Sequence, residues 1–142
     1  MRKVLFSHDR LDVYRLSLEY VAWAISLCRK LSGEHRYSKD QLMRASQSIP
    51  MNIAEGNGKG TRRDKARFFE IARGSALECA AIQDVLEVTN GLAPEQSEKG
   101  KALLVRVVSM LTKLSGRDFE NGVKDDHDHD YAHAHETTMI ES

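Results

Sequence analysis

Apolar residues recur every three or four positions along most of the first 116 residues, which is the spacing of one helix face. Glycines and turn residues divide this pattern into four segments, residues 9–32, 38–56, 61–90 and 94–116. Short alternating runs of β-branched and aromatic residues, which are typical of strands, are absent. Four helices joined by short connections predict an all-α protein, an antiparallel up-down-up-down four-helix bundle.

Local signals indicate where several of these helices begin. Ser38 is followed three residues later by Gln41, which is the pattern of a capping box. Thr61 stands in the same relation to Asp64, so it is expected to cap the third helix. Pro94 fits the first turn of the fourth helix, where its missing N–H costs nothing.

The first helix carries two apolar stripes. One consists of Leu11, Tyr14, Leu18, Val21, Ile25 and Cys28, and the other of Val13, Leu16, Tyr20, Trp23 and Leu27. At roughly 100° per residue the stripes lie about 140–160° apart. A helix buried on both sides within its own monomer is one explanation. We favour the other, in which the stripe that contains Trp23 is an oligomer interface.

The second and third helices hold a set of polar and small residues at helical spacing. Ser48, Asn52 and Glu55 share a face that borders the apolar one, so their polar groups need partners. The third helix offers Arg67, Arg73, Ser75 and Glu78. A structural network and a ligand pocket both fit, and the network is favoured because no nucleophile and base are paired nearby.

Backbone features belong to the same region. Pro50 is expected to kink the second helix, which ends near Gly56. Small side chains near Gly74 predict the closest approach of another helix, along a seam in which Phe68 precedes Ala72. The complete predicted structural motif is Ser48, Pro50, Asn52, Glu55, Gly56, Gly74, Ser75 and Glu78.

The formal net charge of zero conceals an asymmetry along the chain. All 21 basic residues precede Asp125, whereas six of the 21 acidic residues follow Lys124, so residues 1–124 carry a net charge of +6. This balance is compatible with an anionic partner. The basic residues are densest in one group, which we call the basic cluster: Lys59, Arg62, Arg63, Lys65, Arg67 and Arg73. Arginines suit bidentate phosphate contacts, although a solvated helix start explains the same pattern.

The C-terminal residues lack periodicity. Residues 1–120 are therefore predicted to form the bundle domain and residues 121–142 a disordered acidic, histidine-rich tail. His127, His129, His133 and His135 lie among aspartates and would bind a divalent metal weakly, because nothing preorganises them. We favour a solubilising tail and predict no metal site or cofactor. A further hypothesis is that the tail folds over the basic cluster and competes with nucleic acid.

No signal peptide and no apolar run of about 20 residues is present, so a soluble cytoplasmic protein without a membrane partner is expected. Cys28 and Cys79 lie within apolar helical patterns and are expected to be small core residues. No arrangement of catalytic residues is recognised, which favours a non-enzymatic protein.

Three motifs in this order resemble the 23S rRNA-intervening-sequence protein family, which includes the accessory variability protein of diversity-generating retroelements. They are Leu11-Asp-Val-Tyr14, Ser48-Ile-Pro-Met-Asn-Ile-Ala-Glu-Gly56, and Arg67-Phe-Phe-Glu-Ile-Ala-Arg-Gly-Ser-Ala-Leu-Glu78. The resemblance covers about residues 10–114 and implies a four-helix bundle that assembles as a homopentamer. For the retroelement branch it implies a basic surface that binds nucleic acid and a reverse transcriptase partner. The acidic tail departs from the family pattern.

These observations favour a non-enzymatic homo-oligomer that binds RNA or DNA, or a reverse transcriptase, as an accessory or scaffold protein. One alternative is a protein–protein adaptor without affinity for nucleic acid. Another is a weak metal-binding protein that acts through its tail.

Overall fold

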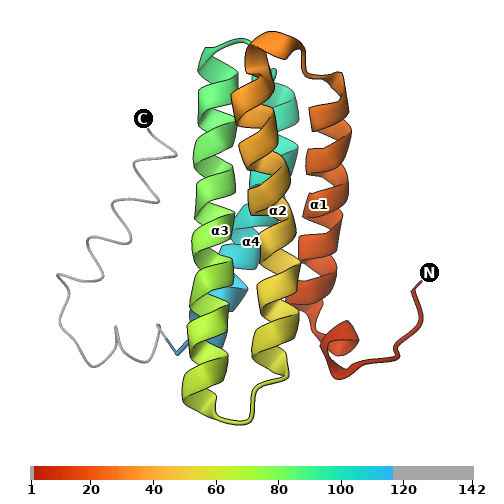
Figure 1. Ribbon diagram of the computed structural model, residues 1–142, viewed down its shortest axis with the longest axis vertical. Coiled ribbons are helices and arrows are strands. Elements are labelled where there is room, and N and C mark those ends of the chain that lie inside the picture. Colours follow the sequence, from red (N-terminus) through yellow and green to blue (C-terminus); the bar gives the residue numbers. More distant parts are fainter. Residues whose placement is uncertain (1, 117–142) are drawn as a thin grey trace, which may run out of the picture.

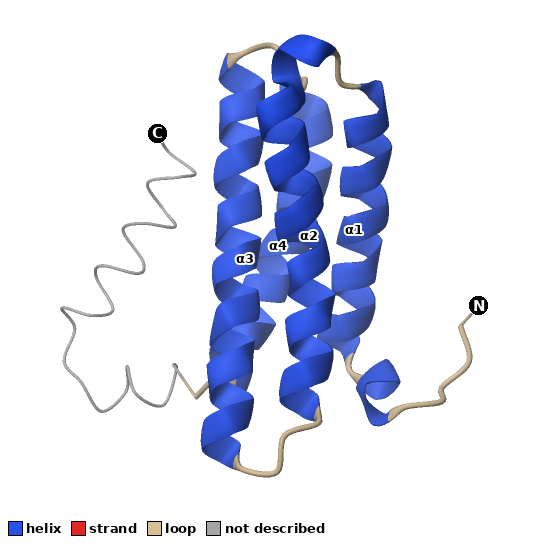
Figure 2. Ribbon diagram, viewed as in Figure 1, coloured by secondary structure: helices blue, strands red, loops and turns tan. Residues whose placement is uncertain are grey.

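The structure, a computed structural model, describes residues 2–116, and these form four long helices in one bundle (Figure 1). The helices are α1 (Asp12–Lys30), α2 (Arg36–Asn57), α3 (Arg62–Val88) and α4 (Pro94–Leu114), with short 3₁₀ turns η1 (Ser7–Arg10) and η2 (Gly33–His35). Within the described range no strand is present (Figure 2). Each helix packs against its neighbours in sequence, and α4 packs against α1. The predicted up-down-up-down bundle is confirmed.

Two of the predicted helix starts are confirmed and two are not. The Thr61 side chain accepts the N–H of Asp64 at 3.1 Å, and Pro94 occupies the first turn of α4. The predicted capping box at Ser38 is wrong, because α2 begins at Arg36 and Ser38 lies inside it. The first helix begins at Asp12 and not at Asp9, which belongs to η1.

The stripe of α1 that contains Trp23 faces the core of this chain. Val13, Leu16, Tyr20 and Leu27 are buried in the core of this same chain, at most 7% exposed. The prediction of an oligomer interface is therefore wrong for these four. Trp23 is half-buried against the core, with its ring 5.5 Å from that of Tyr20.

The other stripe of α1 is the more exposed one. Leu11 and Tyr14 pack against the edge of the core, and Cys28 is buried. Between them, Leu18, Val21 and Ile25 are half-buried and lie outside the core cluster. We call these three residues the outer stripe. Periodicity predicted two apolar stripes correctly, but it did not distinguish the one that faces the other helices.

A buried polar network joins α1, α3 and α4. The Tyr20 hydroxyl donates to Gln83 Oε1 at 2.6 Å, and Gln83 Nε2 donates to the carbonyl and hydroxyl oxygens of Ser97, both at 3.0 Å. Ser97 in turn donates to Glu87 Oε2 at 2.5 Å. Because an unpaired buried amide is costly, this chain of bonds fixes the register of the three helices.

Candidate nucleic-acid interface

The turn between α2 and α3 is built on a close contact between helices. Gly56 is buried, and a Cβ placed there would lie 3.0 Å from Phe68 Cβ and 3.0 Å from Phe69 Cε1. Glycine at this position therefore lets the start of α3 approach the end of α2. Phe69 enters the core, whereas Phe68, predicted to belong to the seam, is half-buried and lies outside the core cluster.

Two cationic side chains contact the Phe68 ring, one from the turn before α3 and one from α3 itself. Lys59 Nζ lies 4.9 Å from the centre of its ring, and Arg67 Cζ lies 4.7 Å from it. Both distances are typical of cation–π contacts. Lys59 also pairs with Glu55 at 3.2 Å. Sequence reasoning missed this role of Phe68, because it placed Phe68 and not Phe69 on the buried side of α3.

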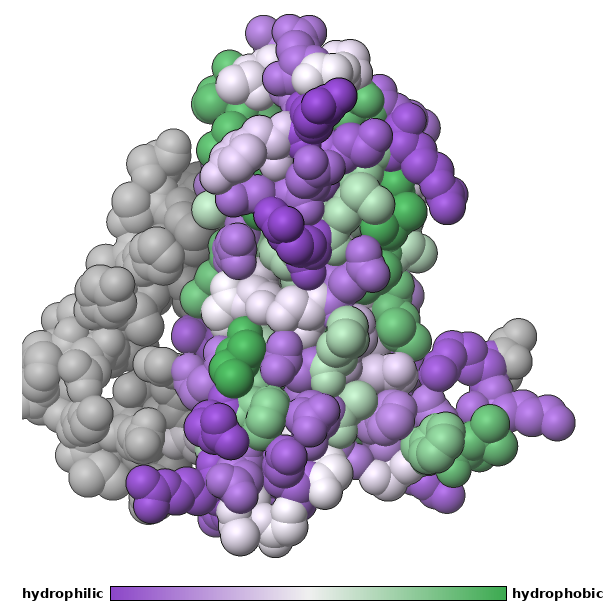
Figure 3. Space-filling view, in the orientation of Figure 1, coloured by the Kyte–Doolittle hydropathy of each residue, from purple (hydrophilic) through white to green (hydrophobic). Residues whose placement is uncertain are grey.

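Three arginines are exposed on the first two turns of α3. Arg62, Arg63 and Arg67, which we call the arginine face, are solvent-exposed, and neither Arg62 nor Arg63 forms an ion pair with another described residue. They lie at the amino end of a 27-residue helix, where the helix dipole adds positive potential. Hydrophilic side chains cover much of the visible face of the bundle, including this end (Figure 3). The arrangement suits an anionic ligand.

Two members of the predicted basic cluster serve the fold. Lys65 Nζ donates to the carbonyl oxygen of Asn57 at 2.8 Å, so it caps the end of α2. Arg73 is buried, 9% exposed, and its Nε donates to Thr112 Oγ1 on α4 at 2.8 Å. The prediction that Arg73 contacts nucleic acid is therefore corrected: this side chain joins α3 to α4.

The predicted polar motif of α2 and α3 is brought together only in part. Ser48 and Ser75 share a hydrogen bond of 2.9 Å between their hydroxyls, and Asn52 Nδ2 donates to the carbonyl and hydroxyl oxygens of Ser48 at 2.9 and 3.0 Å. These bonds within and between helices are those of a structural network. Pro50 is buried within a continuous α2.

The other predicted members of the motif lie outside this network. Glu55 and Glu78 are solvent-exposed, and Glu55 pairs with Lys59 at the end of its own helix. Gly74 is exposed too, and a Cβ added to it would meet nothing within 4 Å. Gly74 itself therefore faces away from the other helices, whereas its neighbours Ala72 and Ala76 are fully buried and Ser75 bonds to Ser48 on α2. A Cβ added at Gly56 or Gly100 would meet another helix at 3.0 Å or less.

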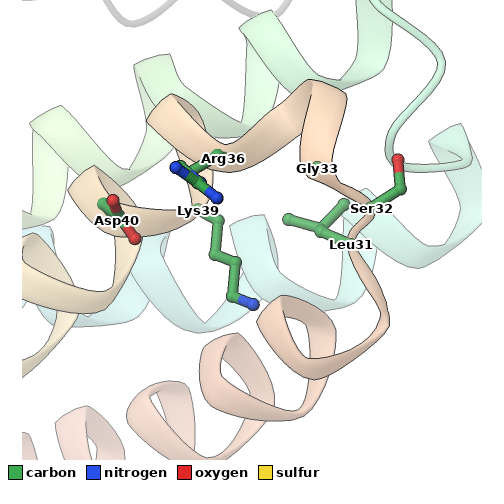
Figure 4. A pocket seen from close by; sticks show the side chains of 6 residues that line it. All are labelled: Leu31, Ser32, Gly33, Arg36, Lys39 and Asp40. Carbon is green, nitrogen blue, oxygen red and sulfur yellow. The ribbon is translucent and has the colours of Figure 1, made fainter.

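A hollow of about 390 Å³ lies at the opposite end of the bundle (Figure 4). It is lined by Leu31, Ser32, Gly33, Arg36, Lys39 and Asp40, and the Lys39 side chain extends from α2 toward the end of α1. Cations near the carboxyl end of a helix offset its negative potential. The hollow holds no pair of nucleophile and base that would indicate catalysis.

The described residues were compared with the requirements of a metal site, a reactive thiol and a membrane span. Within residues 2–116 no group of three or more His, Cys, Asp or Glu side chains could hold a metal ion, and the histidines of the predicted tail lie outside this range. Burial raises the pKa of Cys79 to about 12 and raises that of Cys28 as well, so both thiols stay protonated at neutral pH. Over the same residues, no helix has the length and apolar character needed to cross a membrane.

Comparison with known proteins relates this bundle to one family. The family model described as 23S rRNA-intervening sequence protein matches residues 9–113, which is most of the chain. The chain belongs to this family. Among solved structures, this chain matches a protein of unknown function from the S23 ribosomal protein family of Bacteroides thetaiotaomicron. The two are 25% identical with a TM-score of 0.68, and the match covers 72% of this chain and 97% of that one. No curated protein matches the chain.

Proposed function

We propose that this protein is a non-enzymatic, homo-oligomeric scaffold that binds nucleic acid through the arginine face. The carrying observation is the exposure of Arg62, Arg63 and Arg67 together at the amino end of α3, where Arg62 and Arg63 have no ion-pair partner among the described residues. Guanidinium groups bind phosphates bidentately and are weakly hydrated, which favours arginine over lysine at such a surface.

Lys59 extends this surface across the turn. Because Lys59 and Arg67 both contact Phe68, less side-chain entropy is lost when a phosphate binds between them. The Phe68 ring is half-buried and carries these cations, so its part in the proposal is to position them. Lys65 adds charge while it caps α2.

Assembly would multiply a weak site. The family resemblance implies a homopentamer, and a ring would display five copies of the arginine face, so that one strand of RNA or DNA engages several copies at once. A reverse transcriptase is the protein partner implied for the retroelement branch of the family. Cytoplasmic location also remains a prediction.

The test compares two full-length triple variants that lose the same charge. Arg62→Gln/Arg63→Gln/Arg67→Gln removes the arginine face, and Arg29→Gln/Arg36→Gln/Arg106→Gln removes three exposed arginines elsewhere. Binding to a fluorescent single-stranded RNA and to the matching DNA is measured over a range of salt concentrations. Each lost phosphate contact lowers the slope of log K against log salt by about 0.7 for a single strand.

We expect the first variant to lose at least tenfold in affinity and roughly two units of slope, whereas the control variant changes little. Equal losses in both variants would mean that net charge alone attracts the nucleic acid. If the wild-type protein binds neither probe and purifies with the absorbance ratio of a nucleic-acid-free protein, an adaptor without affinity for nucleic acid becomes the better interpretation.

A further inference from the structure

The carboxyl end of α4 lies at the same end of the bundle as the arginine face. Helices α3 and α4 are antiparallel neighbours, so α4 ends in the half of the bundle in which α3 begins (Figure 1). The bond from Arg73 to Thr112 fixes this register, because it joins the first half of α3 to the last turn of α4. The last turn of α4 therefore lies in the same half of the bundle as the arginine face.

The chain beyond α4 is long enough to reach that surface. Arg62 lies 11 residues before Arg73 in α3, a distance of about 17 Å along the helix axis. Asp125 lies nine residues after Gly116, and a stretch of this length spans up to about 30 Å when extended. Even with the width of one helix added, the segment that starts at Asp125 can lie over Arg62 and Arg63.

The charges of the two segments are complementary. Residues 125–130 contain Asp125, Asp126, Asp128 and Asp130 and no lysine or arginine, whereas residues 59–67 contain five basic side chains and one acidic one. Carboxylates and phosphates make the same paired hydrogen bonds with guanidinium groups. An acidic segment of the chain and a nucleic acid therefore suit the same side chains.

We propose that the acidic segment 125–130 of this chain occupies the arginine face and competes there with nucleic acid. The contact itself follows from the position, reach and charge of the two segments, and the competition rests on the proposed function. Tethering gives the segment a high effective concentration, so a weak contact is sufficient. The contact is electrostatic and exposed, so salt weakens it.

The experiment uses two full-length variants with the same gain in net charge. Asp125→Asn/Asp126→Asn/Asp128→Asn/Asp130→Asn neutralises the segment. Glu34→Gln/Asp40→Asn/Glu95→Gln/Glu98→Gln neutralises four exposed acids at the opposite end of the bundle. The first readout needs no nucleic acid: the rate at which phenylglyoxal modifies each arginine at low salt, followed by peptide mass spectrometry.

We expect Arg62, Arg63 and Arg67 to react several-fold faster in the segment variant than in the wild type. Arg29 and Arg36 should react at the same rate in these two proteins. In the control variant the arginine face should react at the wild-type rate. High salt should remove the difference. Equal rates at the arginine face in the wild type and the segment variant would overturn the proposal.

The second readout is binding of the single-stranded RNA at about 50 mM salt, where electrostatic contacts are strongest. The segment variant should bind roughly tenfold more tightly than the control variant. Equal affinities would overturn the competition. Faster arginine modification without any RNA binding would leave the contact standing and reject the proposed function, so the two failures are distinguishable.

Discussion

At the scale of single residues, three helical glycines have three different environments. Gly56 allows the contact with Phe68 and Phe69 that builds the candidate interface. A Cβ at Gly100 would lie 2.6 Å from two ring atoms of Trp23 and 2.9 Å from Gln83 Oε1, so α4 approaches α1 and α3 closely there. Gly74 faces open space on the exposed side of α3. Sequence spacing does not distinguish these three cases, because each depends on the helix that lies opposite.

Alanine at Gly74 and Gly100 should change stability in opposite directions. Gly74→Ala should raise the free energy of unfolding by about 0.5–1 kcal/mol, because alanine loses less backbone entropy in a helix. Gly100→Ala gains the same helix propensity, but its methyl group displaces the Trp23 and Gln83 side chains. Overpacking of this kind costs about 1–3 kcal/mol. Urea unfolding followed by circular dichroism measures both changes, and a Gly100→Ala variant as stable as the wild type would contradict this close packing.

At the scale of elements, the start of α1 shows what the sequence does not reveal. The apolar pattern predicts Asp9 in the first helix, yet its carboxylate accepts the N–H groups of Phe6 and Leu5 at 3.0 Å and an Arg2 guanidinium at 2.9 Å. These bonds hold a 3₁₀ turn in front of the helix. An aspartate that accepts hydrogen bonds from the preceding backbone N–H groups competes with the first turn of a helix. Helix propensity does not predict which of the two forms.

The stability contributed by Asp9 should depend on pH. The N–H groups of Phe6 and Leu5, with Arg2, hold the pKa of Asp9 well below its usual range. A lowered pKa in the folded state gives stability that is fully present above the unfolded-state pKa, about 3.9, and is lost as the pH falls below it. Asp9→Asn should therefore be less stable than the wild type at pH 7, with a difference that shrinks steadily below about pH 4.

Unfolding in urea at a series of pH values measures this difference. Asp12→Asn is the matched control, because Asp12 is exposed and pairs with Arg15 one turn away on the same helix. A difference between Asp9→Asn and the wild type that stays constant down to about pH 2 would show that the carboxylate charge has no part in holding the turn.

The candidate site also divides into residues whose place the sequence predicts and residues whose place only the structure shows. Exposed arginines at a helix start could be located from the sequence, because a capped helix beginning at Thr61 places Arg62, Arg63 and Arg67 on its first two turns. Arg73 could not be assigned, because its burial depends on Thr112, which lies 39 residues away on α4. Local pattern predicts the helices and their apolar stripes, whereas contacts between residues distant in sequence decide which stripe and which polar side chain enter the core.

At the scale of the whole molecule, we propose that subunits would assemble through the outer stripe of α1 and not through the stripe that the sequence suggested. Leu18, Val21 and Ile25 line up along one side of α1 and are only half-buried by this chain. The bundle closes around the Tyr20 side of the helix, so a second subunit would have to meet the opposite flank. The prediction of self-association is thus retained while its residues change.

Val21→Lys should weaken or abolish this assembly, because a charge at the centre of an apolar interface must be desolvated without a partner. Val105→Lys is the control: Val105 is an apolar residue of a different helix, α4, and is 63% exposed. Size-exclusion chromatography with light scattering gives the subunit number of the wild type and both variants, and circular dichroism verifies that each is folded. We expect a wild-type oligomer, a Val21→Lys protein shifted toward monomers and an unchanged Val105→Lys protein. A monomeric wild type would reject assembly itself, whereas dissociation caused by Val105→Lys alone would place the interface on α4 and reject the outer stripe.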